Sequence, residues 1–77
     1  MKPYTVIMQV RPRGSQEPLV SSRPVPVYGR NEHDSIERAK RVLECFEELE
    51  CEKNHASANA TEGWALNLTP KGLILST

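Results

Sequence analysis

The residues of this chain that could form a structural zinc site of the cysteine–histidine type are its two histidines and two cysteines. Cys51 and His55 stand four positions apart, and His33 lies near the start of the same predicted helix. A structural zinc site needs four ligands, usually supplied as two closely spaced pairs. One pair and a distant histidine do not meet that requirement. We therefore expect no metal site and no bound cofactor.

The chain also lacks the patterns that carry catalysis. Its four glycines are isolated from one another, so none belongs to the glycine-rich loop that holds a phosphate group. Ser21, Ser22 and Ser35 lie in a predicted strand and at a predicted helix start, where serine has ordinary structural roles. Cys45 borders an apolar stripe and is expected to be a small buried side chain. We expect a protein that is not an enzyme.

The charges of the 77 residues cancel overall but are unevenly distributed along the chain. Residues 1–30 are mainly basic, whereas residues 31–52 are mainly acidic. Such an asymmetry is informative about charged surfaces and their partners rather than about the fold.

Two strands are predicted at the start of the chain. Residues 4–11 alternate in hydrophobicity and are rich in β-branched side chains, which favours a strand. Residues 12–18 collect turn-forming residues, and residues 19–28 then form a second strand that contains Pro24 and Pro26. Because N–H groups two residues apart point to the same side, these prolines remove donors from one edge only. We predict an edge strand paired with the first strand, with a polyproline-like segment as the alternative.

The clearest predicted element is a helix over residues 31–53, with either Asn31 or Asp34 as its N-cap. Apolar side chains recur at helical spacing and predict a stripe that faces the core. The stripe consists of Ile36, Ala39, Val42, Leu43, Phe46 and Leu49.

The remaining residues complete the predicted fold. Residues 55–63 are expected to form a loop, and residues 64–68 and 73–75 a final hairpin across the turn at 69–72. The order ββαββ predicts a single α+β domain over residues 1–77. We expect an antiparallel sheet of about four strands with one amphipathic helix packed on one face. The other face would stay open, and a homodimer could cover it.

The sequence predicts a cytoplasmic protein that does not contact a membrane. No apolar segment approaches the roughly 18 residues of a membrane span, and the N-terminus lacks the apolar core of a signal peptide. Cys45 and Cys51 point apart on the predicted helix and cannot form a disulfide there, which suits a reducing compartment.

The first two strands are a candidate surface for nucleic acid. If they form a hairpin, their basic side chains line one strip, and two tyrosines are available to stack on bases. These residues are Lys2, Arg11, Arg13, Arg23 and Arg30, with Tyr4 and Tyr28. The acidic helix would repel phosphate groups, so nucleic-acid binding is the second hypothesis.

The predicted helix carries more carboxylates on its outer side than its few basic neighbours can pair. They are Glu37, Glu44, Glu47, Glu48 and Glu52. One interpretation is a solvated face; the other is an acidic surface that docks on a partner's basic groove, of the kind that normally holds nucleic acid. Glu50 falls on the apolar side of the helix, so it should mark the helix margin or meet an arginine such as Arg23 or Arg30.

In size and element order the chain resembles the small accessory proteins that bacteriophages and mobile elements encode, among them inhibitors of host defence such as anti-CRISPR proteins. The resemblance implies a non-enzymatic protein that acts by binding another protein. No motif carries it, so it assigns a role to no particular residue. We predict a protein-interaction module, with a nucleic-acid-binding module as the second hypothesis and a structural homodimer as the third.

Overall fold

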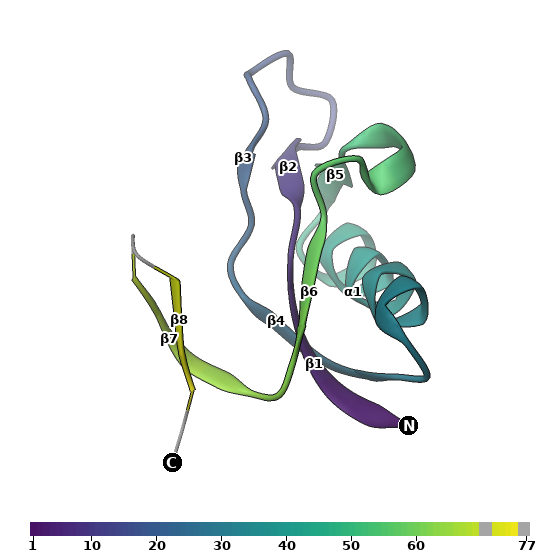
Figure 1. Cartoon of the computed structure of the whole chain (residues 1–77). Helices are drawn as coiled ribbons and strands as arrows, with labels where there is room; N and C mark the ends of the chain where they lie inside the picture. Colours follow the sequence, from purple (N-terminus) through teal and green to yellow (C-terminus); the bar gives the residue numbers. More distant parts are fainter. Residues whose placement is uncertain (70–71, 76–77) are drawn as a thin grey trace.

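The computed structural model describes residues 1–69 and 72–75, with side chains described for residues 1–64. Within these residues the chain forms one α-helix and eight strands, and every strand pairing is antiparallel (Figure 1). Six strands form two three-stranded sheets, ordered β4-β1-β6 and β3-β2-β5, and β7 pairs with β8. The helix packs against strands of both larger sheets. The α+β fold class is confirmed, but the predicted single sheet is replaced by two three-stranded sheets and the separate β7–β8 pair.

Each strand predicted at the start of the chain is shared between the two sheets. The four resulting strands are β1 (Lys2–Ile7), β2 (Gln9–Pro12), β3 (Val20–Ser21) and β4 (Val25–Gly29). β1 pairs with β4 and β2 pairs with β3, so the predicted pairing of residues 19–28 with residues 4–11 is confirmed. Met8 lies between β1 and β2, where the chain passes from one sheet to the other (Figure 1).

β4 is an edge strand, and its one proline, Pro26, directs its backbone away from the neighbouring strand. The amide of Gly63 donates to the carbonyl of Pro3 at 2.9 Å, so the odd-numbered residues of β1 direct their backbone groups toward β6. Pro26 lies opposite Thr5, and Tyr28 lies opposite Pro3. Both β4 residues therefore direct their backbone groups outward, where proline offers no donor. The predicted edge strand is confirmed, and the polyproline-like alternative is wrong.

The helix α1 (Glu32–Phe46) begins where the sequence predicts and ends earlier. Asn31 is the N-cap, because its Oδ1 accepts a hydrogen bond of 2.8 Å from the backbone N–H of Asp34. The predicted extension to residue 53 is wrong. After Glu48, which has a φ of 54°, the chain enters β5 (Leu49–Cys51) and pairs with β2. Pairing with a distant strand here outweighs local helix propensity.

Replacing Asn31 by alanine is expected to lower the free energy of unfolding by about 1 kcal/mol, because the first turn of α1 loses its cap. Urea denaturation followed by circular dichroism measures the change. The matched control is Asn59→Ala, since Asn59 is exposed and has no side-chain hydrogen bond among the described residues. The control should change the stability by less than about 0.5 kcal/mol. An equal loss in both variants would contradict the capping role.

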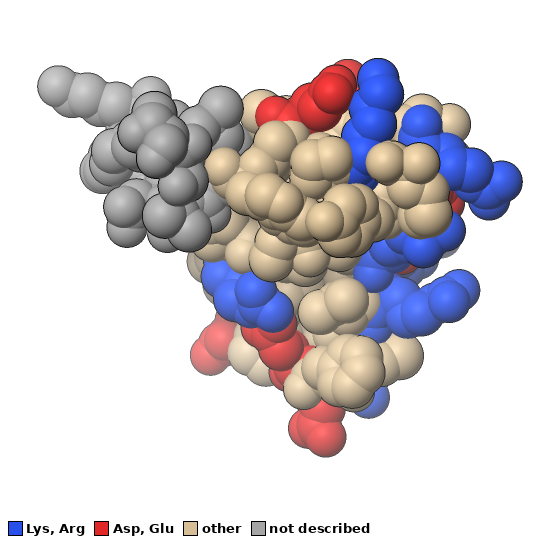
Figure 2. All heavy atoms as spheres, turned by 90° about the horizontal axis from the view of Figure 1, so that it is seen from below, with Lys and Arg blue, Asp and Glu red and all other residues tan. Residues whose placement is uncertain are grey.

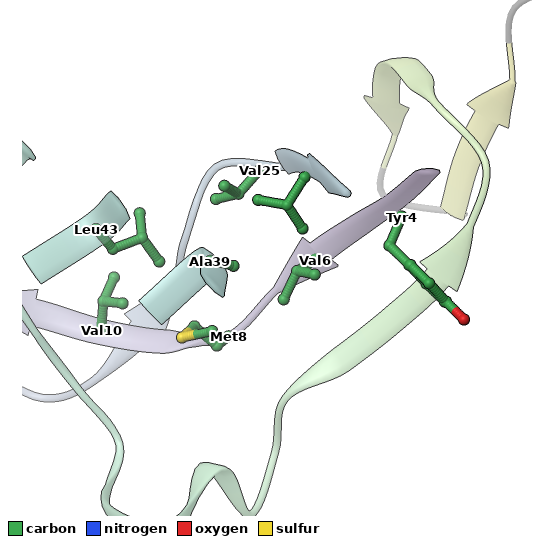
Figure 3. Close-up of a cluster of buried hydrophobic side chains, with 8 residues drawn as sticks. Tyr4, Val6, Met8, Val10, Val25, Ala39 and Leu43 are labelled. Carbon is green, nitrogen blue, oxygen red and sulfur yellow. The ribbon is translucent and has the colours of Figure 1, made fainter. Parts of the chain in front are cut away.

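The core lies between α1 and the sheet formed by β4, β1 and β6. Figure 3 shows side chains from β1, from β4 and from the helix gathered in one cluster. Its buried members are Tyr4, Val6, Met8, Val10, Val25, Val27, Ala39 and Leu43. Ile36, Val42 and Leu49 pack against the cluster while remaining partly exposed. Phe46, the other member of the predicted stripe, is 82% exposed, so its placement in the core was wrong.

The predicted loop over residues 55–63 is wrong in its second half. A 3₁₀ turn, η1 (Lys53–His55), leads into β6 (Asn59–Glu62), which pairs with the free side of β1. The predicted final hairpin is confirmed as β7 (Ala65–Thr69) and β8 (Gly72–Leu75), which form a separate pair (Figure 1). Part of its predicted turn, residues 70–71, lies outside the described residues.

Candidate functional site

The five carboxylates predicted to share one helix face do not share it. Glu37 and Glu44 lie in α1, but the helix ends at residue 46. Glu47 is its C-cap, Glu48 lies in the turn that follows, and Glu52 comes after β5. The carboxylates are therefore spread over the helix, the turn that follows it and the end of β5.

Two of the predicted basic residues form close ion pairs with acidic residues of the second half of the chain. Arg11 lies opposite Glu50 in the β2–β5 ladder, and its Nη2 is 2.6 Å from Glu50 Oε2. Glu50 therefore meets an arginine, as one of its two alternatives predicted, but the arginine is Arg11 and not either of the two examples, Arg23 and Arg30. Arg23 instead binds Glu47, with its Nη2 2.6 Å from Oε2.

The other predicted basic residues also have acceptors. Arg13 donates to the backbone carbonyl of Glu44. The remaining two pairs are Lys2 with Glu62 at 3.9 Å and Arg30 with Asp34 at 3.7 Å. Tyr4 is 5% exposed, so it is not available to stack on a base as predicted.

Asp34 organises the start of α1. Its Oδ2 accepts a hydrogen bond of 2.8 Å from the backbone N–H of Arg30 and one of 3.0 Å from Arg38 Nε. The hydrogen bond from the Arg30 amide, aided by the Arg38 guanidinium, lowers the pKa of this carboxyl below its usual range. Asp34 is therefore ionised at neutral pH and holds the Arg38 side chain.

The cysteines and histidines do not assemble into a site. Burial raises the pKa of the Cys51 thiol to about 11, so this thiol stays protonated at neutral pH. Cys45 is exposed, which corrects the expectation of a buried side chain, and the two cysteines lie in different elements. His55 Nδ1 is 3.7 Å from Glu37 Oε1. Within the described part of the chain, no group of three or more potential ligands is placed to hold a metal ion.

The face of β1 turned away from α1 is less open than predicted. Thr5 on that face is 2% exposed, and its hydroxyl donates to the carbonyl of Gly63 at 2.7 Å. Pro3 and Ile7 on the same face remain partly exposed. The homodimer through this face stays a prediction.

An apolar groove lies between the edge strand β4 and the exposed side of α1. Its volume is about 560 Å³. It is lined by Pro26, Val27, Tyr28, Arg38, Arg41, Val42, Phe46 and Trp64. Because side chains alternate along a strand, Val25 and Val27 enter the core while Pro26 and Tyr28 are left exposed at this edge.

Three of the four aromatic residues of the chain line this groove. Tyr28 is 56%, Phe46 82% and Trp64 36% exposed. The Tyr28 and Trp64 rings meet edge to face, with centroids 5.2 Å apart and an interplanar angle of 88°. Such a contact stabilises both rings in one arrangement. The sequence predicted Phe46 in the core and Trp64 in the final hairpin, and assigned neither to a binding surface, although aromatic residues are scarce in this chain.

The groove also carries positive charge on its helix side. Arg38 is held by Asp34, whereas Arg41 has no ion pair or hydrogen bond with any described residue. In Figure 2 most lysine and arginine side chains lie on the right of the view beside uncharged residues, and aspartate and glutamate side chains lie at the top and in the lower part. The combination of exposed aromatic rings and an unpaired guanidinium is therefore specific to this groove among the described residues.

Comparisons with models of protein families, with curated proteins and with solved structures found no match to this chain.

The residues that line the groove determine which ligands it can bind. Its lining offers apolar surface and guanidinium donors, which suit an apolar side chain next to an anionic group. Among the described residues that line it there is no carboxylate or thiol, and the Tyr28 phenol is the one hydroxyl group. None of the helices in the described residues has the length and hydropathy needed to cross a membrane.

Proposed function

We propose that this protein is a small protein-interaction module, and that the groove between β4 and α1 is its docking surface. The observation that supports this proposal is the exposure of Phe46 beside Tyr28 and Trp64. Contiguous exposed apolar patches mark interaction sites in soluble domains. Tryptophan, tyrosine and arginine are also the residue types that contribute most binding energy at protein interfaces.

The edge of β4 indicates how a partner would bind. Pro26 offers no N–H donor on the outer side of β4, and Pro24, which precedes the strand, has no N–H either. Arg23 Nη1 already donates to the Pro24 carbonyl at 3.1 Å. Addition of a partner strand at this edge is therefore disfavoured, because such binding depends on backbone hydrogen bonds. The partner would bind through side chains that enter the groove.

The acidic surface is the second candidate for binding a partner protein. Glu47 is paired with Arg23, and Glu52 accepts a hydrogen bond of 2.9 Å from the Ser57 backbone N–H. Glu44 and Glu48 are the two members whose side chains have no partner among the described residues. Because only two of the five carboxylates are unpaired, the acidic surface has less support as a docking surface than the groove has. A role as an accessory or inhibitor protein stays a proposal under either surface.

Replacing Phe46 by alanine is expected to weaken partner binding by roughly 30-fold or more, the effect of losing about 2 kcal/mol from a central aromatic contact. The fold should persist, because Phe46 is exposed. The measurement is affinity capture from nuclease-treated lysate of the producing cell, quantified by mass spectrometry. The matched control is Val20→Ala, which removes an exposed apolar side chain of β3 outside the groove.

Proteins recovered by the wild-type chain and by Val20→Ala, but not by Phe46→Ala, would support the groove as docking surface. Equal recovery by both variants would reject it, and charge reversal at Glu44 and Glu48 would then test the acidic surface. A parallel capture from lysate without nuclease tests nucleic-acid binding. Recovery of nucleic acid there, with loss of every associated protein after nuclease treatment, would favour a nucleic-acid-binding module instead.

A further inference from the structure

We infer that the groove binds a partner segment in which an apolar or aromatic anchor residue lies close to a carboxylate, and that Arg41 binds this carboxylate. The inference rests on the proposed function and adds the chemistry of the partner. The groove has an apolar part, which would bind the anchor residue, and one guanidinium without a partner, which would bind the carboxylate.

Of the two arginines that line the groove, Arg41 is the one without an ion pair or hydrogen bond to any described residue. Arg38, one turn earlier on α1, is occupied by Asp34, with Nε 3.0 Å from Oδ2. Glu37 is the residue four positions before Arg41, but its Oε1 lies 3.7 Å from His55 Nδ1. Arg41 therefore keeps its donors for a ligand, and a guanidinium binds a carboxylate through two parallel hydrogen bonds.

The anchor would be bound beside Phe46. Val42 and Phe46 are separated by one helical turn and line the groove together with Pro26 of β4. The edge-to-face pair of Tyr28 and Trp64 supplies further aromatic surface. When an apolar side chain enters this groove, its own apolar surface and that of the lining residues are removed from water. This burial is the main source of affinity at such a site.

The geometry of α1 sets the spacing of the partner's two residues. Arg41 and Phe46 are five positions apart, which corresponds to about 7.5 Å along the helix axis and about 140° around it. An extended peptide advances about 3.3 Å per residue, so the axial rise alone spans about two residues. The carboxylate and the anchor are therefore expected about two or more positions apart in an extended partner segment.

The same charges argue against two other occupants. Single-stranded nucleic acid requires a groove with several free cations along the backbone. Among the described residues that line this groove, Arg38 is already paired and only Arg41 has no ion pair or hydrogen bond. A second copy docked groove to groove would offer Arg41 no carboxylate, because the lining residues described for the groove include two arginines and no acidic side chain. A carboxylate-bearing peptide avoids both difficulties.

The test begins with selection of short random peptides, displayed on phage, on the immobilised full-length protein. Selected peptides are expected to combine an aromatic or large aliphatic residue with an aspartate or glutamate about two or more positions away. One selected peptide is then synthesised in two forms, with the acidic residue as glutamate or as lysine. Fluorescence anisotropy measures the affinity of both forms for each protein variant.

Arg41→Glu is expected to weaken binding of the glutamate peptide by about tenfold or more, because a charge-assisted pair is replaced by a repulsive one. The same variant should bind the lysine peptide better than the glutamate peptide. The matched control is Lys53→Glu, an equal charge reversal at an exposed residue of η1 outside the groove, and it should change the affinity by less than about twofold. Circular dichroism establishes that both variants fold.

The outcomes separate this inference from the proposed function. Selected peptides that need Phe46 but show no acidic preference would overturn the inference and leave the groove as a docking surface. Failure to select any peptide would overturn the inference, while the capture experiment with Phe46→Ala tests the function independently. Binding of a fluorescent oligothymidylate that Phe46→Ala abolishes would reject both. Self-association in sedimentation that Phe46→Ala abolishes would assign the groove to a second copy.

Discussion

Replacing Leu43 by alanine is expected to lower the free energy of unfolding by about 2–5 kcal/mol, the usual cost of a large-to-small change in a core. Leu43 is fully buried and belongs to the cluster that joins α1 to β1 and β4. A chain of 77 residues has a total stability of about 4–12 kcal/mol. The substitution therefore removes a large part of the stability of this domain.

The matched control is Phe46→Ala, which deletes a larger apolar side chain three positions later on the same helix. Phe46 is exposed, and alanine favours a helix more than phenylalanine does, so stability should change by less than about 0.5 kcal/mol. Urea denaturation of both variants measures the difference. A loss at Phe46 as large as the loss at Leu43 would mean that Phe46 lies in the core after all.

Replacing Gly29 by alanine is expected to cost about 1–3 kcal/mol, because the new methyl group would overlap the backbone of α1. A Cβ atom at Gly29 would lie 2.9 Å from the N, Cα and Cβ atoms of Ser35. Ser35 is fully buried, and its hydroxyl donates to the carbonyl of Glu32 at 2.7 Å, so it is not free to move away. Gly29 thus permits the end of β4 to approach the first turn of the helix.

Thermal unfolding measures this effect, since each kcal/mol corresponds to a Tm shift of roughly 4–8 °C in a domain of this size. Arg30→Ala is the control at the next position. Arg30 is exposed and its 3.7 Å pair with Asp34 is solvated, so its loss should shift the stability by less than about 0.5 kcal/mol. A Gly29→Ala variant as stable as the wild type would show that strand and helix do not touch here.

Features that depend on neighbouring residues were predictable from the sequence. The alternation along residues 4–11 and 19–28 reports which side chains enter a core, because a strand turns successive side chains to opposite faces. The two prolines predicted the blocked outer edge of β4, because the missing N–H groups are a property of proline itself. Residue type also limited the helix N-cap to two candidates, Asn31 and Asp34, because both side chains can accept a hydrogen bond from the first turn. In the structure, Asn31 accepts this hydrogen bond from the Asp34 amide.

Features that depend on distant segments of the chain were not predictable from the sequence. Leu49 continues the apolar spacing of the helix, yet it lies in β5 because a strand of the first half of the chain is available there as a partner. β6 has small and polar side chains that indicate a loop, but β1 has a free side that pairs with it. In both places hydrogen bonding to a distant strand decides the local structure, and the sequence does not display that partner.

The candidate site differs from its prediction for the same reason. The sequence by itself determined a basic first segment, an acidic second segment and a small set of aromatic residues. Only the tertiary structure decided that Arg11 meets Glu50, 39 positions away, and that Arg23 meets Glu47, 24 positions away. These pairs neutralise part of the basic first segment against the acidic second segment. It also decided that Phe46 stays outside the core beside Arg41, because the helix ends there and the chain turns back toward β2. Charge and periodicity are properties of the chain, whereas a site also depends on which charges remain unpaired after folding.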